Sequence, residues 1–342
     1  MNHHSLAIGA ATLCMMANGQ SSALAAPDSP ATLTQGVQIL SLTNKLRVEI
    51  NGELFTEYWF EGVPRPYCYP IIGPGGASMT RNWPMKTTPN EDHDHPHHRS
   101  LWFAHELVNG HDFWVERTNS GKIVHVSFEE IKSGKDFGTI RSNNKWVAAD
   151  GAVTCTDVET LRIYNPGAKN ERVLDFEARV FASNGELTFG DGKDGMFAVR
   201  LAETMKLKGP IGSGHIVNSN GVRDGDAWGK RADWCDYYGP VDGKIVGIAV
   251  FDHPRNPRHP TWWHVRDYGL FAANPFGQHD FEKLPDKTAG NLVVPSGKSV
   301  TFRYRVYMHE GDEKQAEVAR RYEEYARNQD EVNPKSEGRN SK

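Results

Sequence analysis

Apolar and polar residues alternate along much of the chain, so that every second residue is apolar. The alternation is clearest in four segments: residues 46–50, 174–180, 246–250 and 300–308. It is typical of antiparallel strands with one buried face and one polar face. Short turns that contain glycine, such as Asn51-Gly52 and Asp242-Gly243, separate such segments. The pattern predicts an all-β fold, an antiparallel β-sandwich of two large stacked, supersandwich-like sheets.

One helix is predicted near the C-terminus. Asp312 and Gln315 have the spacing of a capping box, in which each side chain binds the backbone of the other residue. Val318, Tyr322 and Tyr325 follow at intervals of four and three residues, which places them on one helical face. We expect this face to pack against one of the sheets.

The first 25 residues have the features of a secretory signal peptide. The run LAIGAATLCMMA (residues 6–17) is followed by Ala23-Leu24-Ala25, a small-x-small cleavage pattern. The run is shorter than the ~20 residues that span a bilayer, so we expect no membrane insertion and a secreted or periplasmic protein. Residues 26–328 show no linker or repeat and are predicted to form a single domain. Residues 329–342 are polar and predicted to be a disordered tail.

Charge and cysteine content narrow the range of partners. A net charge of −4 without basic clusters argues against nucleic acid and anionic membranes as partners. Cys14 lies in the signal segment, which leaves Cys68, Cys155 and Cys235 without a CxxC element. We expect them mainly to be small buried residues, although one pair could form a disulfide in an oxidising compartment. The sequence does not indicate the oligomeric state.

Histidine is concentrated in two clusters that lie far apart in the sequence. They are His93, His95, His97 and His98 in EDHDHPHHR, and His253, His259, His264 and His279 in a downstream stretch. Imidazole titrates near neutral pH, so it suits proton transfer and metal ligation. We expect the clusters to meet in one cleft, with His97 or His98 near His264 and Glu203.

The first cluster also has the composition of a metal site. Pro96 favours an extended His95, so His95 and His97 would point the same way and chelate one ion. Asp92 or Asp94 would add an oxygen ligand or orient a ring. A divalent metal is the one cofactor that the sequence suggests. The alternative is a structural loop in which the histidines bind backbone carbonyls.

Two carboxylates suggest acid–base chemistry. Glu203 lies in the apolar stretch FAVRLAET, where it either pairs with a basic residue or has a raised pKa. Glu203 and Asp236 would suit glycoside chemistry, although the sequence does not fix their separation. The residues expected to be catalytic are His97, His98, Glu203, Asp236 and His264.

Basic and aromatic residues beside the clusters are candidates for substrate binding. We expect Arg99 and Lys230 to hold substrate oxygens or a developing negative charge. Trp102 or Trp114 would support a sugar ring, although such tryptophans are most often core residues. Of the adjacent Trp262 and Trp263, one should face inward and one outward.

Two long motifs resemble a known family. They are DHPHHRSLWFAHELVNGHDFW and WGKRADWCDYYGPVDGKIVGIAVFDHPRNPRHPTWWHVRDYGLFAANPFG. They are similar to the secreted PmoA-like proteins, often labelled "methane oxygenase PmoA", over roughly residues 46–325. Where this family has Gly, the chain has Ser100. The label conflicts with the residues, because a methane-oxidising membrane subunit needs several spanning helices and this sequence has no such segment.

The resemblance implies a secreted β-sandwich that occurs among proteins of polysaccharide and glycoside breakdown. It also draws attention to further residues that match the motifs, without giving their roles. Among these we expect substrate binding by His105, Asn109, Trp228, Arg266 and Asn274.

Three functions are compatible with these features. The first is a secreted carbohydrate-active enzyme, a glycoside hydrolase or lyase, that acts on a small-molecule or oligosaccharide substrate through a His/carboxylate acid–base site. The second is a His-ligated, metal-dependent oxygenase, which the density of histidines favours. The third is a non-catalytic sugar-binding module. Export, the nearby tryptophans and the family's setting favour the first.

Overall fold

The computed structural model describes Met1 and residues 35–327. The chain divides into two units, Met1–Thr32 and Leu33–Lys342, and all the described helices and strands belong to the second. The predicted signal peptide (1–25) lies outside the described residues apart from Met1, and so does the whole predicted tail (329–342). Within the described chain, no helix is both long and apolar enough to cross a membrane.

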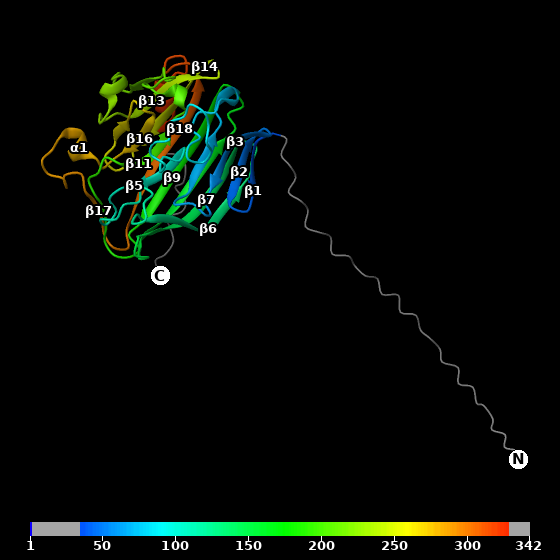
Figure 1. Ribbon diagram of the computed structural model, residues 1–342, viewed down its shortest axis with the longest axis vertical. Helices are drawn as coiled ribbons and strands as arrows, with labels where there is room; N and C mark the ends of the chain where they lie inside the picture. Colours follow the sequence, from blue (N-terminus) through cyan, green and yellow to red (C-terminus); the bar gives the residue numbers. More distant parts are fainter. Residues whose placement is uncertain (2–34, 328–342) are drawn as a thin grey trace. The chain divides into compact units, whose positions relative to one another are not determined.

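Two eight-stranded antiparallel sheets form the fold (Figure 1). The first contains, in spatial order, β1 (Val37–Ser41), β2 (Lys45–Ile50), β3 (Glu53–Trp59), β4 (Tyr67–Ile71), β5 (Leu101–His105), β11 (Gly195–Arg200), β16 (Leu270–Asn274) and β15 (Trp262–Val265). The second contains β12 (His215–Asn218), β13 (Trp234–Val241), β14 (Lys244–Asp252), β18 (Ser299–Glu310), β9 (Glu171–Phe181), β8 (Val153–Tyr164), β7 (Phe137–Val147) and β6 (Lys122–Lys132).

Few other elements accompany these sheets. They are the small pair β10 (Leu187–Phe189) and β17 (Leu292–Val294), the helices α1 (Gln278–Glu282) and α2 (Val318–Arg327), and the 3₁₀ turns η1 (Pro74–Gly76), η2 (Glu203–Met205) and η3 (Asp224–Ala227). The predicted antiparallel sandwich is therefore confirmed. Each of the four segments chosen from the alternation lies in a strand, namely β2, β9, β14 or β18.

Aromatic side chains join the two sheets. Phe103 of the first sheet contacts Phe176 and Phe302 of the second, with ring centroids 5.3 and 6.0 Å apart. Phe197 stacks on Tyr304 at 5.0 Å. The three described cysteines are buried and unpaired, as expected of small core residues. These contacts fix which face of each strand points into the core.

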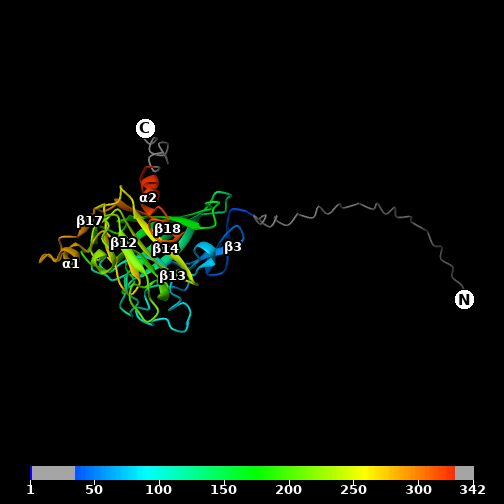
Figure 2. The same ribbon diagram turned by 90° about the horizontal axis from the view of Figure 1, so that it is seen from above.

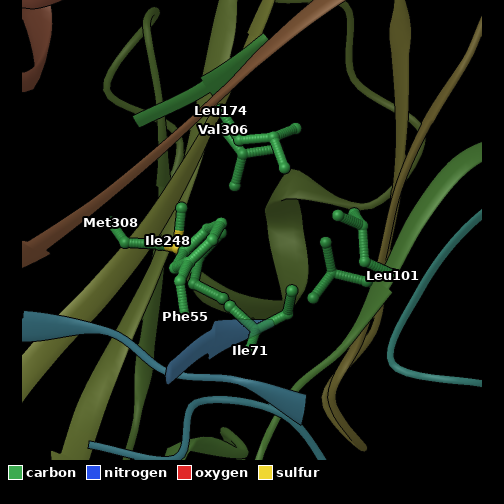
Figure 3. Close-up of a pocket in the computed structure, with 8 residues that line it drawn as sticks. Phe55, Ile71, Leu101, Leu174, Ile248, Val306 and Met308 are labelled. Atoms are coloured by element: carbon green, nitrogen blue, oxygen red, sulfur yellow. The ribbon is translucent and has the colours of Figure 1, made fainter. Parts of the chain in front are cut away.

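The core also contains a small void (Figure 3). Its lining is entirely apolar and consists of Phe55, Ile71, Leu101, Leu174, Val199, Ile248, Val306 and Met308. The void has no room for a water molecule. It is therefore a gap in the packing between the sheets and not a ligand site.

Helix α2 packs on the outer face of the second sheet, beside β14 and β18 (Figure 2). Tyr322 and Tyr325 contact Phe251 of β14, with ring centroids 5.7 and 5.9 Å apart. The predicted capping box forms, because the amides of Asp312 and Gln315 each donate to the other side chain, at 3.1 and 2.8 Å.

The predicted start of this helix is wrong by several residues. The capping box closes a turn, and the helix itself begins at Val318. Glu317 has φ 51°. This left-handed conformation interrupts the helical path between the capping box and Val318.

Two carboxyl groups are buried between the sheets, on the inner face of β8. Asp157 accepts a hydrogen bond from Asn144 at 2.7 Å and another from the Trp146 indole. Glu159 accepts a weaker bond from the Tyr58 hydroxyl, at 3.3 Å. Burial, and then the charge of Asp157, raise the pKa of Glu159 well above its usual value. Burial also raises the pKa of Asp157 to about 6.

The pH dependence of stability tests this arrangement. The pKa of Glu159 is about 4 in the unfolded chain and is raised in the folded protein. The wild type therefore loses stability as pH rises from about 4 through the folded-state pKa of Glu159. The uncharged Glu159→Gln variant lacks this loss. Its stability relative to the wild type should therefore increase by about 1–3 kcal/mol between pH 4 and 9. Urea unfolding across this range measures the change. Glu130→Gln on the exposed strand β6 is the control, and parallel curves for wild type and Glu159→Gln would refute the assignment.

Candidate functional site

Residues of both histidine clusters border the outer face of the first sheet, which points away from the second sheet. Phe103 of β5 and Phe197 of β11 point inward, because both contact Phe176 of the second sheet. Side chains alternate along a strand, so Trp102 and Arg200 point outward from the same two strands.

A row of outward-facing residues crosses four neighbouring strands. By register it runs from Trp102 on β5 through Ala198 on β11 and Ala272 on β16 to His264 on β15. Neighbouring strands are ~4.8 Å apart, so the row spans about 14 Å. The two alanines fill its middle with methyl groups only. This row forms the floor of the candidate site. Trp102, which lies next to the first histidine cluster, is at one end of the floor, and His264 of the second cluster is at the other end.

Asp94 holds the loop of the first cluster on this floor. Its Oδ1 accepts hydrogen bonds from Arg81 and from Arg200 of β11, the latter at 2.8 Å. Both arginines are fully buried. Arg81 also donates to the backbone carbonyls of Asp94 and His95, at 3.0 Å each. Burial alone would raise the pKa of Asp94, but the hydrogen bond from His95 and the charges of Arg200 and Arg81 outweigh it and lower that pKa.

The expected extended conformation of His95 is wrong. Its φ is 39°, and the His98 amide donates to its carbonyl at 3.0 Å, so the chain turns sharply here. The Nδ1 atom of His95 lies 2.7 Å from Asp94 Oδ2. The rings of His95 and His97 are 5.7 Å apart and nearly perpendicular. The hydrogen bonds around Asp94 bend the loop and override the preference for an extended residue before proline.

No preformed metal site accompanies this turn. Across residues 35–327, no group of three or more His, Cys, Asp or Glu side chains is placed to hold a metal ion. A divalent metal at His95 and His97 stays a prediction, and it would require a further ligand and a rearranged loop.

His98 is buried within the same loop. Its Nδ1 lies 3.1 Å from Arg200 Nη1. A guanidinium only donates, so Nδ1 accepts and the proton of the neutral ring sits on Nε2. Burial, and then neighbouring charges, lower the pKa of His98 well below 6.5. Trp102 and Trp114 lie 5.3 and 5.8 Å from the ring and are themselves buried, so they enclose His98.

His97 and Arg99 lie beside His98 in different environments. His97 is half-buried, and burial followed by the charge of Arg65 lowers its pKa to about 3. Arg99 forms two hydrogen bonds of 2.7 Å with Glu116. This bidentate pair occupies the guanidinium that was expected to hold substrate oxygens.

A second polar group surrounds His264 at the other end of the floor. Its Nε2 lies 3.8 Å from Asp194 Oδ1, while its buried Nδ1 has no hydrogen-bond partner. Burial, and then the charge of Arg266, lower the pKa of His264 to about 3. The Asp194 amide donates to Glu106 Oε1 at 2.8 Å. Burial, and then the charge of Asp194, raise the pKa of the half-buried Glu106 to about 7.

Two half-buried aromatic rings connect the first histidine cluster with the polar group around His264. Tyr268 stacks on His95 at 5.2 Å, and Trp228 lies 6.3 Å from His264. The guanidinium carbon of Arg266 lies 5.6 Å from the centre of each aromatic ring. Arg266 thus bridges Tyr268 on the side of the first cluster and Trp228 on the side of the second.

Glu203 belongs to an ion-pair network near the first histidine cluster. Its Oε2 is 2.6 Å from Lys206 Nζ, which also binds Asp92 Oδ2 at 2.5 Å. The second oxygen of Glu203 is buried without a hydrogen-bond partner. Of the two roles considered for Glu203, the structure shows the pairing with a basic residue.

Asp236 lies on the other side of the sandwich. Its neighbour Tyr237 contacts Phe271 of the first sheet and so points inward, which turns Asp236 outward from the second sheet. There it pairs with His309 Nε2 at 3.2 Å. Burial alone would lower the pKa of His309, but the charge of Asp236 and the hydrogen bond to it contribute to a net rise of that pKa. The structure does not bring Asp236 together with His98 or His264.

The remaining predicted residues are spread around the site. His105 points into the core and binds the Gly190 carbonyl at 2.8 Å. Asn109 exchanges hydrogen bonds with the backbone of Glu186 and Thr188, and the Lys230 side chain is exposed.

Three of the predicted residues have clear structural roles. Asn274 donates to the carbonyls of Gly192 and Lys193, so it positions the segment that carries Asp194. Trp262 and Trp263 point to opposite faces as predicted, with their indoles bound to Glu282 and to the Ala232 carbonyl.

The sequence did not point to several residues of this site. Among them are Arg81, Glu106, Asp194, Arg200 and Tyr268. Glu106 directly follows His105 within the first motif, and Tyr268 follows Asp267 in the second, so both were within reach of the motif reading. Asp194 and Arg200 lie in a segment between the motifs, and only the pairing of β11 with β5 and β16 brings them to the site.

Removing the Asp94 charge should destabilise the protein. Asp94→Asn leaves Arg81 and Arg200 buried without their carboxylate, at a cost of about 1–3 kcal/mol because Asp94 itself is one-third exposed. The folded-state pKa of Asp94 is lowered, so the wild type has this advantage above about pH 4 and loses it as pH falls through the folded value. Chemical denaturation at pH 7 and pH 3 measures the effect. Asp150→Asn in an exposed turn is the control, and equal stability of Asp94→Asn and wild type at pH 7 would contradict the role of Asp94.

The solved structures that are weakly similar to this chain include a 4-alpha-glucanotransferase from Thermococcus litoralis and a galactose mutarotase related enzyme from Lactobacillus acidophilus. Each has 10% sequence identity to this chain and a TM-score of 0.28. Each comparison covers 81% of this chain. The chain spans 40% of the glucanotransferase and 97% of the mutarotase-related enzyme. At this TM-score neither likeness carries an argument about function.

Comparison at the level of sequence is more specific about family. No curated protein matches the chain. Residues 45–323, which include nearly all the strands and every member of the two polar groups on the first sheet, match a single family. The chain therefore belongs to the family of unknown function DUF6807.

Proposed function

We propose that the protein is an exported, secreted or periplasmic, carbohydrate-active enzyme that cleaves a glycosidic bond, by hydrolysis or by elimination, on the outer face of the first sheet. One observation carries the proposal. The Glu106 carboxylate accepts a 2.8 Å hydrogen bond from the Asp194 backbone amide, and the Asp194 carboxylate lies 3.8 Å from Nε2 of His264, whose buried Nδ1 has no hydrogen-bond partner within residues 35–327. The resemblance to PmoA-like proteins, with their setting in glycoside breakdown, supports the same assignment.

Glu106 is the general acid in this proposal. Its pKa of about 7 keeps a large share of the carboxyl protonated near neutral pH, so it donates a proton to the departing sugar oxygen. Asp194 is the general base and takes a proton, from water in hydrolysis or, in elimination, from the carbon adjacent to the one that bears the leaving group. Neighbouring carboxyl groups divide these roles when their surroundings separate their proton affinities.

Histidines and aromatic rings bind the sugar in this proposal. His264 is neutral, so its free Nδ1 exchanges a hydrogen bond with a sugar hydroxyl. His97 and His98 supply further hydrogen bonds from the other end of the floor. Trp228 and Tyr268 are half-buried, so each offers part of a ring for contact with the apolar face of a sugar.

The pH profile and one substitution test the acid. On a substrate found by screening the purified protein against glycosides and oxidised glycosides, turnover should fall as pH rises through about 7, because Glu106 loses its proton. Glu106→Gln should lower turnover by roughly 10²–10⁴-fold and remove this alkaline limb. His215→Asn, at an exposed site on the second sheet, is the control. An unchanged profile in Glu106→Gln would refute the role of Glu106.

The same screen separates the alternative functions. Activity should persist in chelator, and its loss there would favour a metal-dependent oxygenase. Binding of sugars without turnover of any of them would favour a non-catalytic module. His264→Gln should weaken substrate binding while circular dichroism stays unchanged, because Gln retains a polar atom facing Asp194.

A further inference from the structure

Arg266 is held rigidly at the edge of the site. It follows β15 directly, and its amide donates to the Leu270 carbonyl at 2.8 Å. Its own carbonyl accepts from Gly269 at 3.0 Å and from the Tyr237 hydroxyl at 3.3 Å. The turn between β15 and β16 therefore fixes the base of this side chain.

The guanidinium of Arg266 has no carboxylate partner among residues 35–327. The arginines of the first cluster differ in this respect, since Arg81 and Arg200 share Asp94, and Arg99 binds Glu116. The adjacent Asp267 does not neutralise Arg266 either, because it pairs with Lys208 at 3.1 Å.

Aromatic rings hold the guanidinium in place. Trp228 and Tyr268 lie on it at 5.6 Å each, and both rings are half-buried. Such contacts stabilise an arginine side chain but leave unused the N–H donors, which lie in the plane of the guanidinium. The site therefore contains a pre-positioned, partly desolvated cation with free donors.

Unused polar atoms surround this cation. His264 Nδ1 and Trp228 Nε1 are both buried, and neither has a hydrogen-bond partner in the described part of the chain. A buried polar group without a partner is unfavourable, so such atoms mark a place where a bound molecule can complete the hydrogen bonds. Imidazole and indole nitrogens are typical hydrogen-bond partners of sugar hydroxyls. The planar guanidinium of Arg266 instead matches the two oxygens of a carboxylate.

We propose that the substrate is an acidic sugar, a uronic acid or uronate-containing oligosaccharide, whose carboxylate binds the Arg266 guanidinium in a bidentate pair. This deepens the proposed function and rests on it. The carboxylate supplies the partner that Arg266 lacks. The sugar ring then lies beside Trp228 and Tyr268, with a hydroxyl at His264.

Calorimetric binding to matched disaccharides tests this inference. The probes are glucuronate- and galacturonate-containing disaccharides, their neutral glucose and galactose counterparts, and a sulfated disaccharide. The wild type should bind the uronates about 10–100-fold more tightly than the neutral sugars, as a charge-assisted pair of about 1.5–3 kcal/mol implies. Added salt should reduce this preference.

Variants of Arg266 show whether the preference comes from this residue. Arg266→Gln should reduce uronate binding to the level of the neutral sugar and leave neutral binding nearly unchanged. Arg266→Lys should keep part of the preference, because an ammonium retains the charge but not the fork. Arg141→Gln removes the same charge from a distant exposed site and should change nothing. Thermal unfolding of each variant verifies that it is folded.

Each result distinguishes this inference from the proposed function. Equal affinity for uronate and neutral sugars would overturn the inference and leave the proposed function standing. A preference for the sulfated sugar, or an equal loss of neutral and acidic binding in Arg266→Gln, would also overturn it. Failure to bind or turn over any sugar would overturn both.

Discussion

The site depends on one carboxylate shared by two buried arginines. Arg81 and Arg200 are withdrawn completely from solvent, and Asp94 Oδ1 accepts a hydrogen bond from each of them. Arg200 belongs to a central strand of the first sheet, whereas Asp94 belongs to the histidine-rich loop. The ion pairs therefore attach the loop to the sheet at a fixed point. Everything that the loop contributes, including the tautomer of His98, follows from this attachment.

Small residues on the sheet complement this attachment. Ala198 and Ala272 leave the middle of the floor flat, so polar groups from β5, β15 and the adjoining loops can approach it from both ends. On the inner face the same strands carry phenylalanine rings that bind the second sheet. One sheet thus separates two environments, a dry aromatic core and a polar surface, by the alternation of side chains alone.

The sequence allowed the fold to be predicted well, because alternation is a local signal of period two. The same signal could not reveal the site, which arises from strand order. Arg200 looks like an ordinary polar position of a strand until β11 pairs with β5 and brings it under His98. Asp236 looked like a partner for Glu203, but the alternation along β13 turns it to the opposite side of the sandwich. Local preference also failed at His95, where the bonds to Asp94 and Arg81 impose a turn.

The contrast between paired and unpaired arginines indicates which kind of ligand the site would bind. An arginine that already binds a carboxylate contributes to folding, and its removal is felt first in stability. Arg266 is stabilised by aromatic rings instead, and no carboxylate of residues 35–327 pairs with its charge. Burial, and then the same charge, lower the pKa of His264 and keep that imidazole neutral, available as a hydrogen-bond partner and not as a competing cation. A ligand that binds both residues would therefore need an anionic group for Arg266 and a hydroxyl for His264. An acidic sugar has both groups.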